Sequence, residues 1–324
     1  SLRRTHFEHR LGVVGSSAEQ LSRRLQALLH DRARLEESVR PETPEQPPRL
    51  AFVFSGQGTQ WPRMAANLID QEPVFSETIE RCDAALRPLA GWSILEKLTA
   101  AENESELDQT EFAQPAIFAV QMGLAALWRS WGVTPDAVVG HSLGEIAAAC
   151  TAGILTLVEA VHLVYHRGRL MQQATGSGKM VSVDLAWDEV ERIIAPNKSE
   201  ISIGAINSPN ATVISGSIAA VDAVVAQLQT RGVGIHPLRV NYAFHSPQMD
   251  PYARELSALL GGWRGKTEQV TFVSTVSGGK LNGAGLDAAY WGRNIRQSVR
   301  FADAVRQLAA DGVTVFLEVS PHPA

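Results

Sequence analysis

Three short apolar runs constrain the fold of this chain more than any other feature. They are LAFVF at 50–54, DAVV at 136–139 and TVFLEV at 314–319, and each ends in a loop of small or polar residues. Continuous apolar runs of this length are typical of parallel strands that are buried on both faces. Helical patterns separate them, for example at 110–132 and 156–174. This alternation predicts an α/β core with a parallel sheet.

The middle of the chain has a different order of elements. Strand patterns at 179–185, 200–207, 211–216 and 234–240 alternate with helical patterns at 186–195 and 218–232. The order is βαββαβ, which is that of ferredoxin-like domains. We therefore expect a ferredoxin-like subdomain over residues 179–240, inserted into a core formed by 49–178 and 241–324.

The first 48 residues are predicted to be a small connector. Residues 9–15 favour a short strand, and Ser16 with Glu19 forms a capping-box pattern for a helix that runs to about Ser38. Four prolines in the nine residues 40–48 then predict an extended linker. The chain begins without Met and ends in SPHPA, so we expect it to be a piece of a longer polypeptide.

Composition argues against several classes of function. A net charge of −5 provides no basic surface for nucleic acid or an anionic membrane. No apolar run is long enough to span a bilayer and no signal peptide is recognisable. The two cysteines, Cys82 and Cys150, lack metal-ligand spacing, so neither a metal nor a disulfide framework is expected and a cytoplasmic location is predicted.

The pentapeptide GHSLG at 140–144 follows the second apolar run and precedes a helical pattern. In a G-x-S-x-G sequence the serine lies on a tight turn between strand and helix, as in α/β-hydrolase-like cores. The turn exposes the hydroxyl, and the free N–H groups at the helix start stabilise an oxyanion. Ser142 is therefore a candidate nucleophile.

A serine nucleophile needs a base, and the chain has nine histidines. His141 is adjacent to Ser142, so we expect its side chain to point away from the hydroxyl. His245 in NYAFHS and His322 in SPHP each lie in a loop near a strand end. The residues alone do not choose between these two.

Two further features suggest a ligand site. The glycines of SGQGTQ at 55–60 permit close approach of the backbone, which suits a second N–H donor to an oxyanion better than a phosphate loop. Val164, Arg167 and Met171 fall on one helical face, so a guanidinium lies beside an apolar stripe. Arg167 is thus either a carboxylate ligand, a partner of an acid such as Glu159, or a surface side chain.

Together these motifs resemble a known family. GQGTQW, GHSLGE, HRGRLMQ, AFHS and EVSPHP occur in this order in the acyltransferase domains of modular polyketide synthases, which are similar to malonyl-CoA:acyl-carrier-protein transacylases. The resemblance covers nearly the whole chain. Residues 1–48 resemble the linker between a ketosynthase and an acyltransferase.

The resemblance implies an activity and its partners. The expected reaction loads a malonyl or substituted malonyl extender unit from CoA onto the phosphopantetheine thiol of an acyl carrier protein, through an acyl-enzyme, in polyketide biosynthesis. The expected partners are the acyl-CoA, the carrier protein and a ketosynthase in the same polypeptide. No cofactor is expected.

The resemblance also implies the roles of individual residues. Ser142 matches the nucleophile, His245 its general base and Arg167 the ligand of the substrate carboxylate. The backbone N–H groups of Gln57 and Leu143 match the oxyanion hole. The family orients its histidine through backbone carbonyls, and we expect the SPHP loop at 320–323 to provide one. The substrate pocket is expected to involve Tyr242, Phe244, Met171, Asn207 and Gln114.

One stretch departs from the family pattern. Malonyl-selective members resemble HAFH and methylmalonyl-selective members resemble YASH, whereas this chain has YAFH at 242–245. Tyr242 replaces the histidine that accompanies phenylalanine, so we expect the Phe244 ring to lose support. Leu143 places an apolar residue beside the nucleophile. A relaxed pocket for substituted malonyl units is the prediction, with a strict malonyl transacylase as the alternative.

Two other classes remain as alternatives. A serine hydrolase of the α/β-hydrolase type would pass the acyl group to water, but Arg167 and the inserted subdomain argue against it. A docking domain without activity would not need Ser142, His245 and Arg167 together.

Overall fold

The computed structural model describes residues 11–31 and 47–323, and the chain forms two compact units, 1–48 and 49–324. The described part of the first unit contains helix α1 (Ala18–His30). Its N-cap is Ser17, whose hydroxyl accepts from the N–H of Gln20, so the predicted Ser16–Glu19 box is wrong. Gln20 instead takes the place predicted for Glu19, because its amide oxygen accepts from the N–H of Ser16 at 2.6 Å.

Other expectations for this unit are only partly testable. Residues 11–15 form no strand, and α1 ends at His30. The rest of the predicted strand, the helix beyond Asp31 and most of the proline-rich stretch lie outside the described residues. The assignment of 1–48 as a linker stays a prediction.

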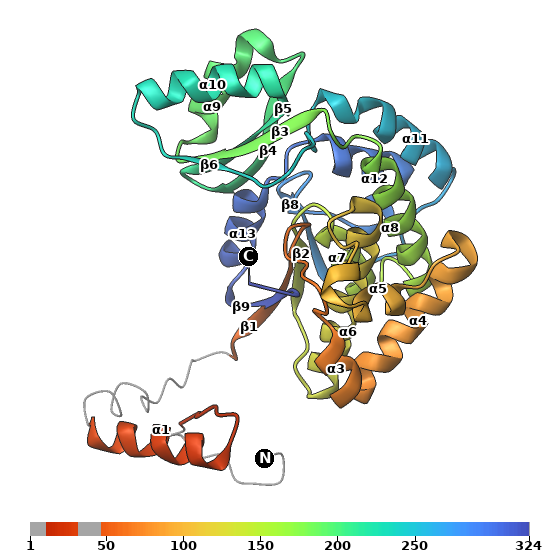
Figure 1. The fold of residues 1–324 in the computed structure, drawn as a ribbon, viewed down its shortest axis with the longest axis vertical. Helices are drawn as coiled ribbons and strands as arrows, with labels where there is room; N and C mark the ends of the chain where they lie inside the picture. Colours follow the sequence, from red (N-terminus) through yellow and green to blue (C-terminus); the bar gives the residue numbers. More distant parts are fainter. Residues whose placement is uncertain (1–10, 32–46, 324) are drawn as a thin grey trace. The chain divides into compact units, whose positions relative to one another are not determined.

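The second unit is built on a five-stranded sheet (Figure 1). Its order is β8 (Gly279–Lys280), β7 (Thr271–Ser274), β2 (Ala137–Gly140), β1 (Arg49–Phe54) and β9 (Val313–Val319). The last four are parallel, and β8 pairs antiparallel with β7. The three apolar runs are thus neighbouring strands β2, β1 and β9, which confirms the predicted parallel sheet.

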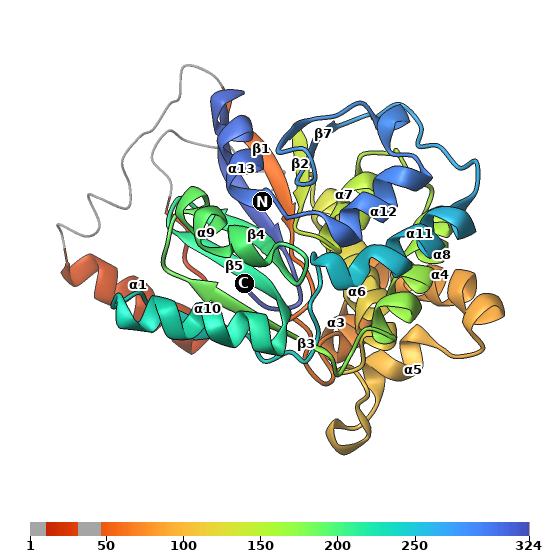
Figure 2. The ribbon, with the colours of Figure 1, turned by 90° about the horizontal axis from the view of Figure 1, so that it is seen from above.

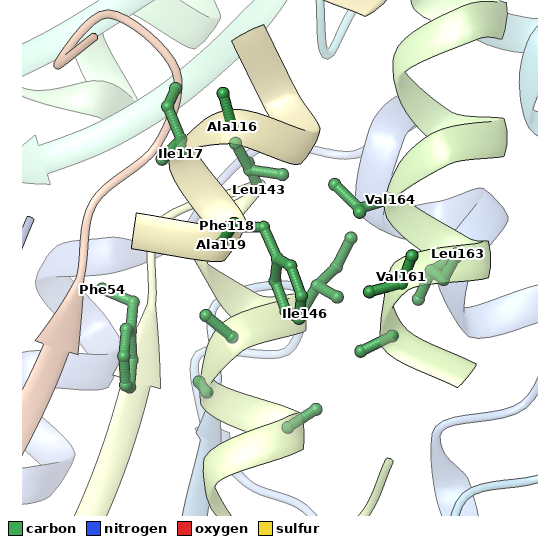
Figure 3. Packing of buried hydrophobic residues seen from close by; sticks show 14 of the residues in the cluster. Phe54, Ala116, Ile117, Phe118, Ala119, Leu143, Ile146, Val161, Leu163 and Val164 are labelled. Carbon is green, nitrogen blue, oxygen red and sulfur yellow. The ribbon is translucent and has the colours of Figure 1, made fainter. Parts of the chain in front are cut away.

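Helices cover both faces of this sheet, as expected for strands that are apolar throughout. Phe52, Phe54 and Val138 pack into the main core beside the helices of one face, and Figure 3 shows Phe54 there with Leu143, Ile146 and residues of two helices. Ala51 and Val139 point to the opposite face, towards Ala304 and Leu308.

The helices of this unit outside the small sheet are α3 (Ala66–Gln71), α4 (Pro73–Ala90), α5 (Ile94–Thr99), α6 (Thr110–Ser130), α7 (Gly144–Thr151), α8 (Leu157–Gln172), α11 (Asp250–Leu260), α12 (Ala288–Arg296) and α13 (Phe301–Ala310), with short 3₁₀ turns at Glu102–Glu104, Pro247–Met249 and Gly283–Gly285.

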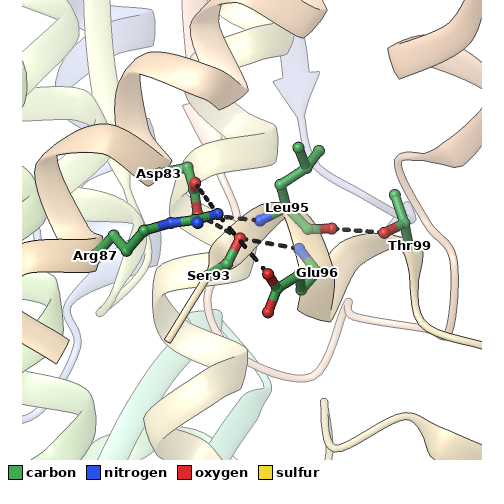
Figure 4. Close-up of polar contacts among 6 residues, drawn as sticks. All are labelled: Asp83, Arg87, Ser93, Leu95, Glu96 and Thr99. Carbon is green, nitrogen blue, oxygen red and sulfur yellow. Dashed lines mark hydrogen bonds and ion pairs between the residues drawn. The ribbon is translucent and has the colours of Figure 1, made fainter. Parts of the chain in front are cut away.

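A polar cluster joins α4 to α5 and is shown in Figure 4. Ser93 caps α5, because its hydroxyl accepts from the N–H of Glu96 at 3.2 Å. The same hydroxyl donates to Asp83 Oδ1 at 2.7 Å, and Asp83 also pairs with Arg87 at 3.0 Å. These contacts tie the start of α5 to the side of α4.

A separate antiparallel sheet is formed by the middle of the chain (Figure 2). The elements follow the order β3 (Gly178–Val183), α9 (Trp187–Ile194), a 3₁₀ turn (Ala195–Asn197), β4 (Ile201–Ser208), β5 (Ala211–Ser217), α10 (Ile218–Thr230) and β6 (Ile235–Pro237). The sheet order β4-β5-β3-β6 is the ferredoxin-like one, so the predicted βαββαβ subdomain is confirmed. Its last strand is shorter than predicted.

The two ends of this insert meet at its base. The carbonyl of Asn241, after β6, accepts from the N–H of Gly176, before β3, at 2.7 Å. A Cβ on Gly178 would lie 2.4 Å from the backbone nitrogen of Ala243, so only glycine fits where the two segments cross. Entry and exit of the insert are therefore held side by side.

Candidate active site

Ser142 lies on the predicted turn between β2 and α7, with a φ of 52°. A Cβ on Gly140 would lie 2.1 Å from the backbone carbon of Gly144, and one on Gly144 would lie 2.2 Å from the oxygen of Phe54. Both positions of the motif therefore require glycine, because any side chain would overlap backbone atoms. The strand-turn-helix geometry predicted from GHSLG is present.

The side chain of Ser142 contacts His245, with Oγ and Nε2 2.8 Å apart. The Nδ1 atom of His245 lies 2.8 Å from the carbonyl oxygen of Gln297. Since a carbonyl only accepts, Nδ1 carries the proton and Nε2 is left to accept from the serine hydroxyl. His245 is therefore held in the tautomer that a general base requires.

The expectation that the SPHP loop orients this histidine is wrong. Ser320 forms hydrogen bonds with Ser55 at 2.7 Å and with the carbonyl of His322 at 2.6 Å. The carbonyl of Pro321 accepts from the indole of Trp61 at 3.1 Å. This loop fastens the end of β9 to the loop after β1, while the carbonyl at the histidine comes from the segment after α12.

The environment of His245 keeps its ring neutral. Burial and, to a smaller extent, the charges of Arg167 and His141 together lower the pKa of His245 to about 3, against the opposing effect of the hydrogen bond to Gln297. The ring is 4% exposed. His245 is thus an uncharged base over the whole physiological range.

Arg167 reaches the same serine from α8. Val164, Arg167 and Met171 are all buried, which confirms the predicted helical face. The Nη2 atom of Arg167 donates to Ser142 Oγ at 2.9 Å and Nη1 donates to the amide oxygen of Gln114 at 2.7 Å. Arg167 is therefore neither a surface side chain nor a partner of an acid on its own helix.

Glu159, the acid considered as a partner, has a different task. It completes a capping box at the start of α8 with Thr156. Burial outweighs the opposing effect of Glu145 and lowers the pKa of Arg167 to about 9, so the guanidinium stays charged at neutral pH. Among the described residues no carboxylate lies within ion-pair distance of Arg167, so a buried cation faces the Ser142 hydroxyl without a directly bonded anion.

The loop after β1 brings Gln57 to this site. Its side-chain nitrogen donates to Thr110 Oγ1 at 3.1 Å, and its oxygen accepts from Gln114 Nε2 at 3.1 Å. Leu143 directly precedes α7, and its side chain is buried in the main core (Figure 3). Within the described residues, neither backbone N–H of Gln57 or Leu143 donates a hydrogen bond to the protein backbone outside helices and strands.

A cavity of about 790 Å³ opens beside Gln57, and Ser142, Arg167 and His245 are not among the residues that line it. It lies between the loop after β1, the turn at His141 and the edge of the small sheet. His141 Nε2 lies 3.0 Å from Asn207 Oδ1, so the His141 ring points to the small subdomain and away from the Ser142 hydroxyl, as predicted. The lining includes Ser55, Gly56, Gln57, His141, Asn207, Leu238, Phe301 and His322.

Tyr242 and Phe244 form a stacked pair, with ring centroids 3.7 Å apart and planes 11° from parallel. Phe244 is buried and Tyr242 is half-buried. Burial raises the pKa of Tyr242 to about 12. The expectation that Phe244 loses ring support is therefore wrong, because Tyr242 replaces that support by stacking.

Three residues of this site were not predicted from the sequence: Glu145, Asn294 and Gln297. Asn294 lies between Arg167, Ser142 and Glu145, all within hydrogen-bond distance. Glu145 is fully buried although it directly follows the GHSLG motif. Only Glu145 could have been noticed in the sequence, because it is a charged residue at the start of a helix of small residues. Asn294 and Gln297 are far from Ser142 in the sequence.

Two kinds of feature are absent from the described ranges, 11–31 and 47–323. No group of three or more His, Cys, Asp or Glu side chains is placed to hold a metal ion. No helix there is long and apolar enough to cross a membrane.

Comparison with known proteins identifies a family. Residues 51–324 match the family model described as acyl transferase domain. The chain is 41% identical over 320 residues to the erythronolide synthase EryA2 of Saccharopolyspora erythraea; the match covers 99% of this chain and 9% of that protein. The chain thus spans less than a tenth of this relative's length.

Solved structures agree with this match. The acyltransferase domain from module 8 of the salinomycin polyketide synthase is 41% identical with a TM-score of 0.82, covering 85% of this chain and 65% of that one. The acyltransferase domain of SpnD, solved in complex with 2-(pent-4-yn-1-yl)malonyl, is 33% identical with a TM-score of 0.86, covering 98% and 74%. The chain therefore belongs to the acyl transferase domain family and is an acyltransferase domain of the polyketide synthase type.

Proposed function

We propose that this domain loads a malonyl-type extender unit from CoA onto the phosphopantetheine thiol of an acyl carrier protein, with Ser142 as the covalent carrier. The observation that carries the proposal is the position of one hydroxyl, Ser142 Oγ, between His245 Nε2 at 2.8 Å and Arg167 Nη2 at 2.9 Å. A base and a buried cation at one nucleophile suit an acyl group that also bears a carboxylate.

In the first half-reaction His245 accepts the proton of Ser142 as Oγ attacks the thioester carbonyl. The negative charge of the tetrahedral intermediate develops on the former carbonyl oxygen, where the N–H groups of Gln57 and Leu143 would stabilise it. Collapse breaks the C–S bond, and the protonated His245 returns its proton to the leaving CoA sulfur. The product is a Ser142 ester.

The second half-reaction reverses these roles. His245 accepts the proton of the phosphopantetheine thiol, the sulfur attacks the ester carbonyl, and the proton passes to Ser142 Oγ as the C–O bond breaks. CoA and carrier protein thus use the same site in turn, which is a ping-pong scheme. No cofactor or metal takes part in the proposed reaction.

Arg167 is proposed to bind the free carboxylate of the malonyl unit. A guanidinium presents paired N–H groups that match a carboxylate, and this interaction strengthens away from water. Arg167 is 1% exposed and has no directly bonded acid among the described residues, so an incoming carboxylate would supply the missing anion. Gln114 accepts from Arg167 Nη1, and its own Nε2 lies 3.5 Å from the Met171 sulfur.

The choice of extender unit is proposed to depend on the Tyr242–Phe244 pair. Stacking holds the Phe244 ring, but an aromatic pair contributes only about 0.5–1.5 kcal/mol beyond its buried area. Stacking therefore adds only a small cost to moving the ring, on top of the burial that the ring would lose. The complex of the related SpnD domain with a substituted malonyl supports a pocket of this kind.

The experiment that tests the proposal follows the acyl-enzyme by intact mass. The domain is mixed with malonyl-CoA, a substituted malonyl-CoA and acetyl-CoA, with Ser142→Ala as control, and then given a carrier protein bearing phosphopantetheine. We expect a mass increase equal to the acyl group, absent in Ser142→Ala, that the carrier protein removes faster than water does. Faster loss to water would favour a hydrolase, and no acylation would favour a domain without activity.

A further inference from the structure

A chain of buried polar groups leads from Arg167 to a buried carboxylate. Arg167 Nε donates to Asn294 Oδ1 at 3.2 Å, and Asn294 Nδ2 donates to Glu145 Oε2 at 2.8 Å. Glu145 is completely buried, Arg167 is 1% exposed and Asn294 is 2% exposed. The carboxylate and the guanidinium are thus connected through a single amide.

The orientation of this amide is fixed from two sides. Asn294 Nδ2 also donates to the backbone oxygen of Ser142, at 3.1 Å. An amide has one donating end and one accepting end, so two acceptors at Nδ2 leave Oδ1 to face Arg167. Glu145 therefore orients the Asn294 amide so that its accepting oxygen faces Arg167 Nε.

Glu145 is itself held by groups outside the proposed machinery. It accepts from the backbone N–H of Thr275 and from the Tyr290 hydroxyl, the latter at 2.8 Å. Burial raises the pKa of Glu145, and these donors oppose that effect. A buried carboxylate is retained only where it has such partners, and the opposite charge closest along this chain of contacts is Arg167.

The indirect connection has a chemical consequence. If Glu145 met Arg167 directly, it would occupy two N–H groups in the manner of a bidentate ion pair. The amide of Asn294 uses only Nε, so the Nη atoms are left to Gln114, Ser142 and a ligand. Glu145 thus acts on the buried cation from a distance and does not cover the edge that a substrate carboxylate needs.

We propose that Glu145 and Asn294 are positioning residues that hold Arg167 by Nε and present its Nη atoms to the carboxylate of the acyl unit. The two residues act through Arg167, so they set the preference for acyl groups that bear a carboxylate over those that do not. The inference rests on the proposed role of Arg167 in binding that carboxylate.

The test compares kcat/KM for acylation by malonyl-CoA and by acetyl-CoA. In Glu145→Gln the new amide nitrogen faces the Asn294 nitrogen, and in Asn294→Asp two carboxylates face each other. Each variant should lower the malonyl:acetyl ratio by about tenfold or more, because a mispaired buried polar contact is costly. Most of the loss should appear in KM for malonyl-CoA.

The double variant Glu145→Gln/Asn294→Asp exchanges amide and carboxylate and restores the pairing between positions 145 and 294; the contact to the Ser142 carbonyl is lost in Asn294→Asp and in the double variant alike. The amide introduced at position 145 would then donate to the carboxylate introduced at position 294, whose other oxygen accepts from Arg167 Nε. We expect its malonyl:acetyl ratio to recover to within about fivefold of the wild type, a non-additivity that a general loss of stability would not produce. A double variant no better than the worse single variant would overturn the proposal.

Tyr290→Phe is the matched control. It removes a hydroxyl contact to the same carboxylate and leaves the Asn294 contact in place, so the melting temperature should fall while the ratio stays within about twofold.

Arg167→Ala separates this inference from the proposed function. If Arg167→Ala changes the ratio but both single variants lower malonyl and acetyl acylation equally, only the positioning role is wrong; if Arg167→Ala leaves the ratio unchanged, the proposed role of Arg167 is wrong.

Discussion

Ser142 and His245 share a backbone conformation that disfavours most side chains: their φ angles are 52° and 61°. Their side chains meet at 2.8 Å although 103 residues separate them in the chain. Left-handed backbone at a residue other than glycine is unfavourable and persists only where the surroundings impose it. At these two positions the turn after β2 and the loop before α11 impose it, and both side chains are thereby aimed into the same site.

The conformation of Ser142 leads to a prediction on stability. Ser142→Ala and Ser142→Gly both lack the hydroxyl and should both fail to form an acyl-enzyme. Glycine adopts positive φ without steric cost, so Ser142→Gly should be more stable than Ser142→Ala by about 1 kcal/mol. Chemical denaturation of the two variants measures the difference, and equal stabilities would mean that the turn is not strained.

Loss of the base should slow acylation without preventing it. His245→Ala is expected to reduce the acylation rate by about 10²–10⁴, the usual contribution of a general base. Stopped-flow release of CoA from malonyl-CoA gives the rate. A variant that acylates at the wild-type rate would show that another group accepts the proton.

The buried position of His245 predicts an unusual pH profile. Because its pKa is lowered to about 3, the neutral base persists far below the ordinary histidine range. The acylation rate should stay level from about pH 8 to pH 5, where an exposed histidine with a pKa of about 6.5 would already be protonated. A fall centred near pH 6.5 would contradict the lowered pKa.

The same shift affects stability with a definite sign. Between about pH 6.5 and pH 3 the unfolded state protonates this histidine and the folded state does not, so protons favour unfolding. The stabilising contribution of neutral His245 is complete above about pH 6.5 and is lost as the pH falls towards 3. Unfolding free energies of the wild type minus those of His245→Gln should therefore decrease over this window, and a constant difference would argue against it.

Arg167→Ala should change which acyl groups are accepted. Loss of a buried charged pair costs on the order of 2–5 kcal/mol, so malonyl transfer should fall strongly. Acetyl-CoA has no carboxylate and should react as well as before or better. Equal losses for both substrates would show that Arg167 does not bind the carboxylate.

The stacked pair of Tyr242 and Phe244 leads to a prediction on the extender unit. The wild type is expected to use at least one substituted malonyl-CoA within about tenfold of malonyl-CoA, a gap of roughly 1.4 kcal/mol. Phe244→Ser should shift preference towards small branches such as methyl. The values of kcat/KM for malonyl-, methylmalonyl- and a longer alkylmalonyl-CoA measure both effects, and a wild-type preference for malonyl of about a thousandfold would indicate a strict malonyl enzyme.

Periodicity is sufficient to predict the sheets of this protein but not the contacts around Ser142. The apolar runs and the βαββαβ order are properties of consecutive residues, so they are visible in the sequence. The carbonyl that orients His245 is a backbone group, which every residue has, so nothing in the side chains marks Gln297. The SPHP loop follows a parallel strand of the same sheet, as the Ser142 turn does, but its carbonyls contact Trp61 and Ser320 and not His245.

Asn294 escapes prediction for a related reason. A lone asparagine in a helix is usually a surface residue, and only the folded chain brings it 3.1 Å from the backbone of Ser142, 152 residues away. The support for Phe244 could not be predicted from the family pattern, in which a histidine and not a tyrosine accompanies the phenylalanine, and side chains two residues apart in an extended segment are about 6.5 Å apart along the chain, too far for stacked rings. In the loop before His245 the backbone bends and the two rings stack.

Gly176 and Asn241 are hydrogen-bonded at the base of the small subdomain. The subdomain between them could therefore be exchanged at this boundary for that of a related protein. A segment whose two ends are adjacent can be replaced by a relative's without changing the distance that the rest of the chain must span. Tyr242 and Phe244 lie just beyond that boundary, so a chimaera joined there would acquire a new cavity rim, including the position of Asn207, and keep its own aromatic pair. Recombination at this boundary would thus change the part of the cavity lined by the small subdomain and leave the stacked pair of Tyr242 and Phe244 unchanged.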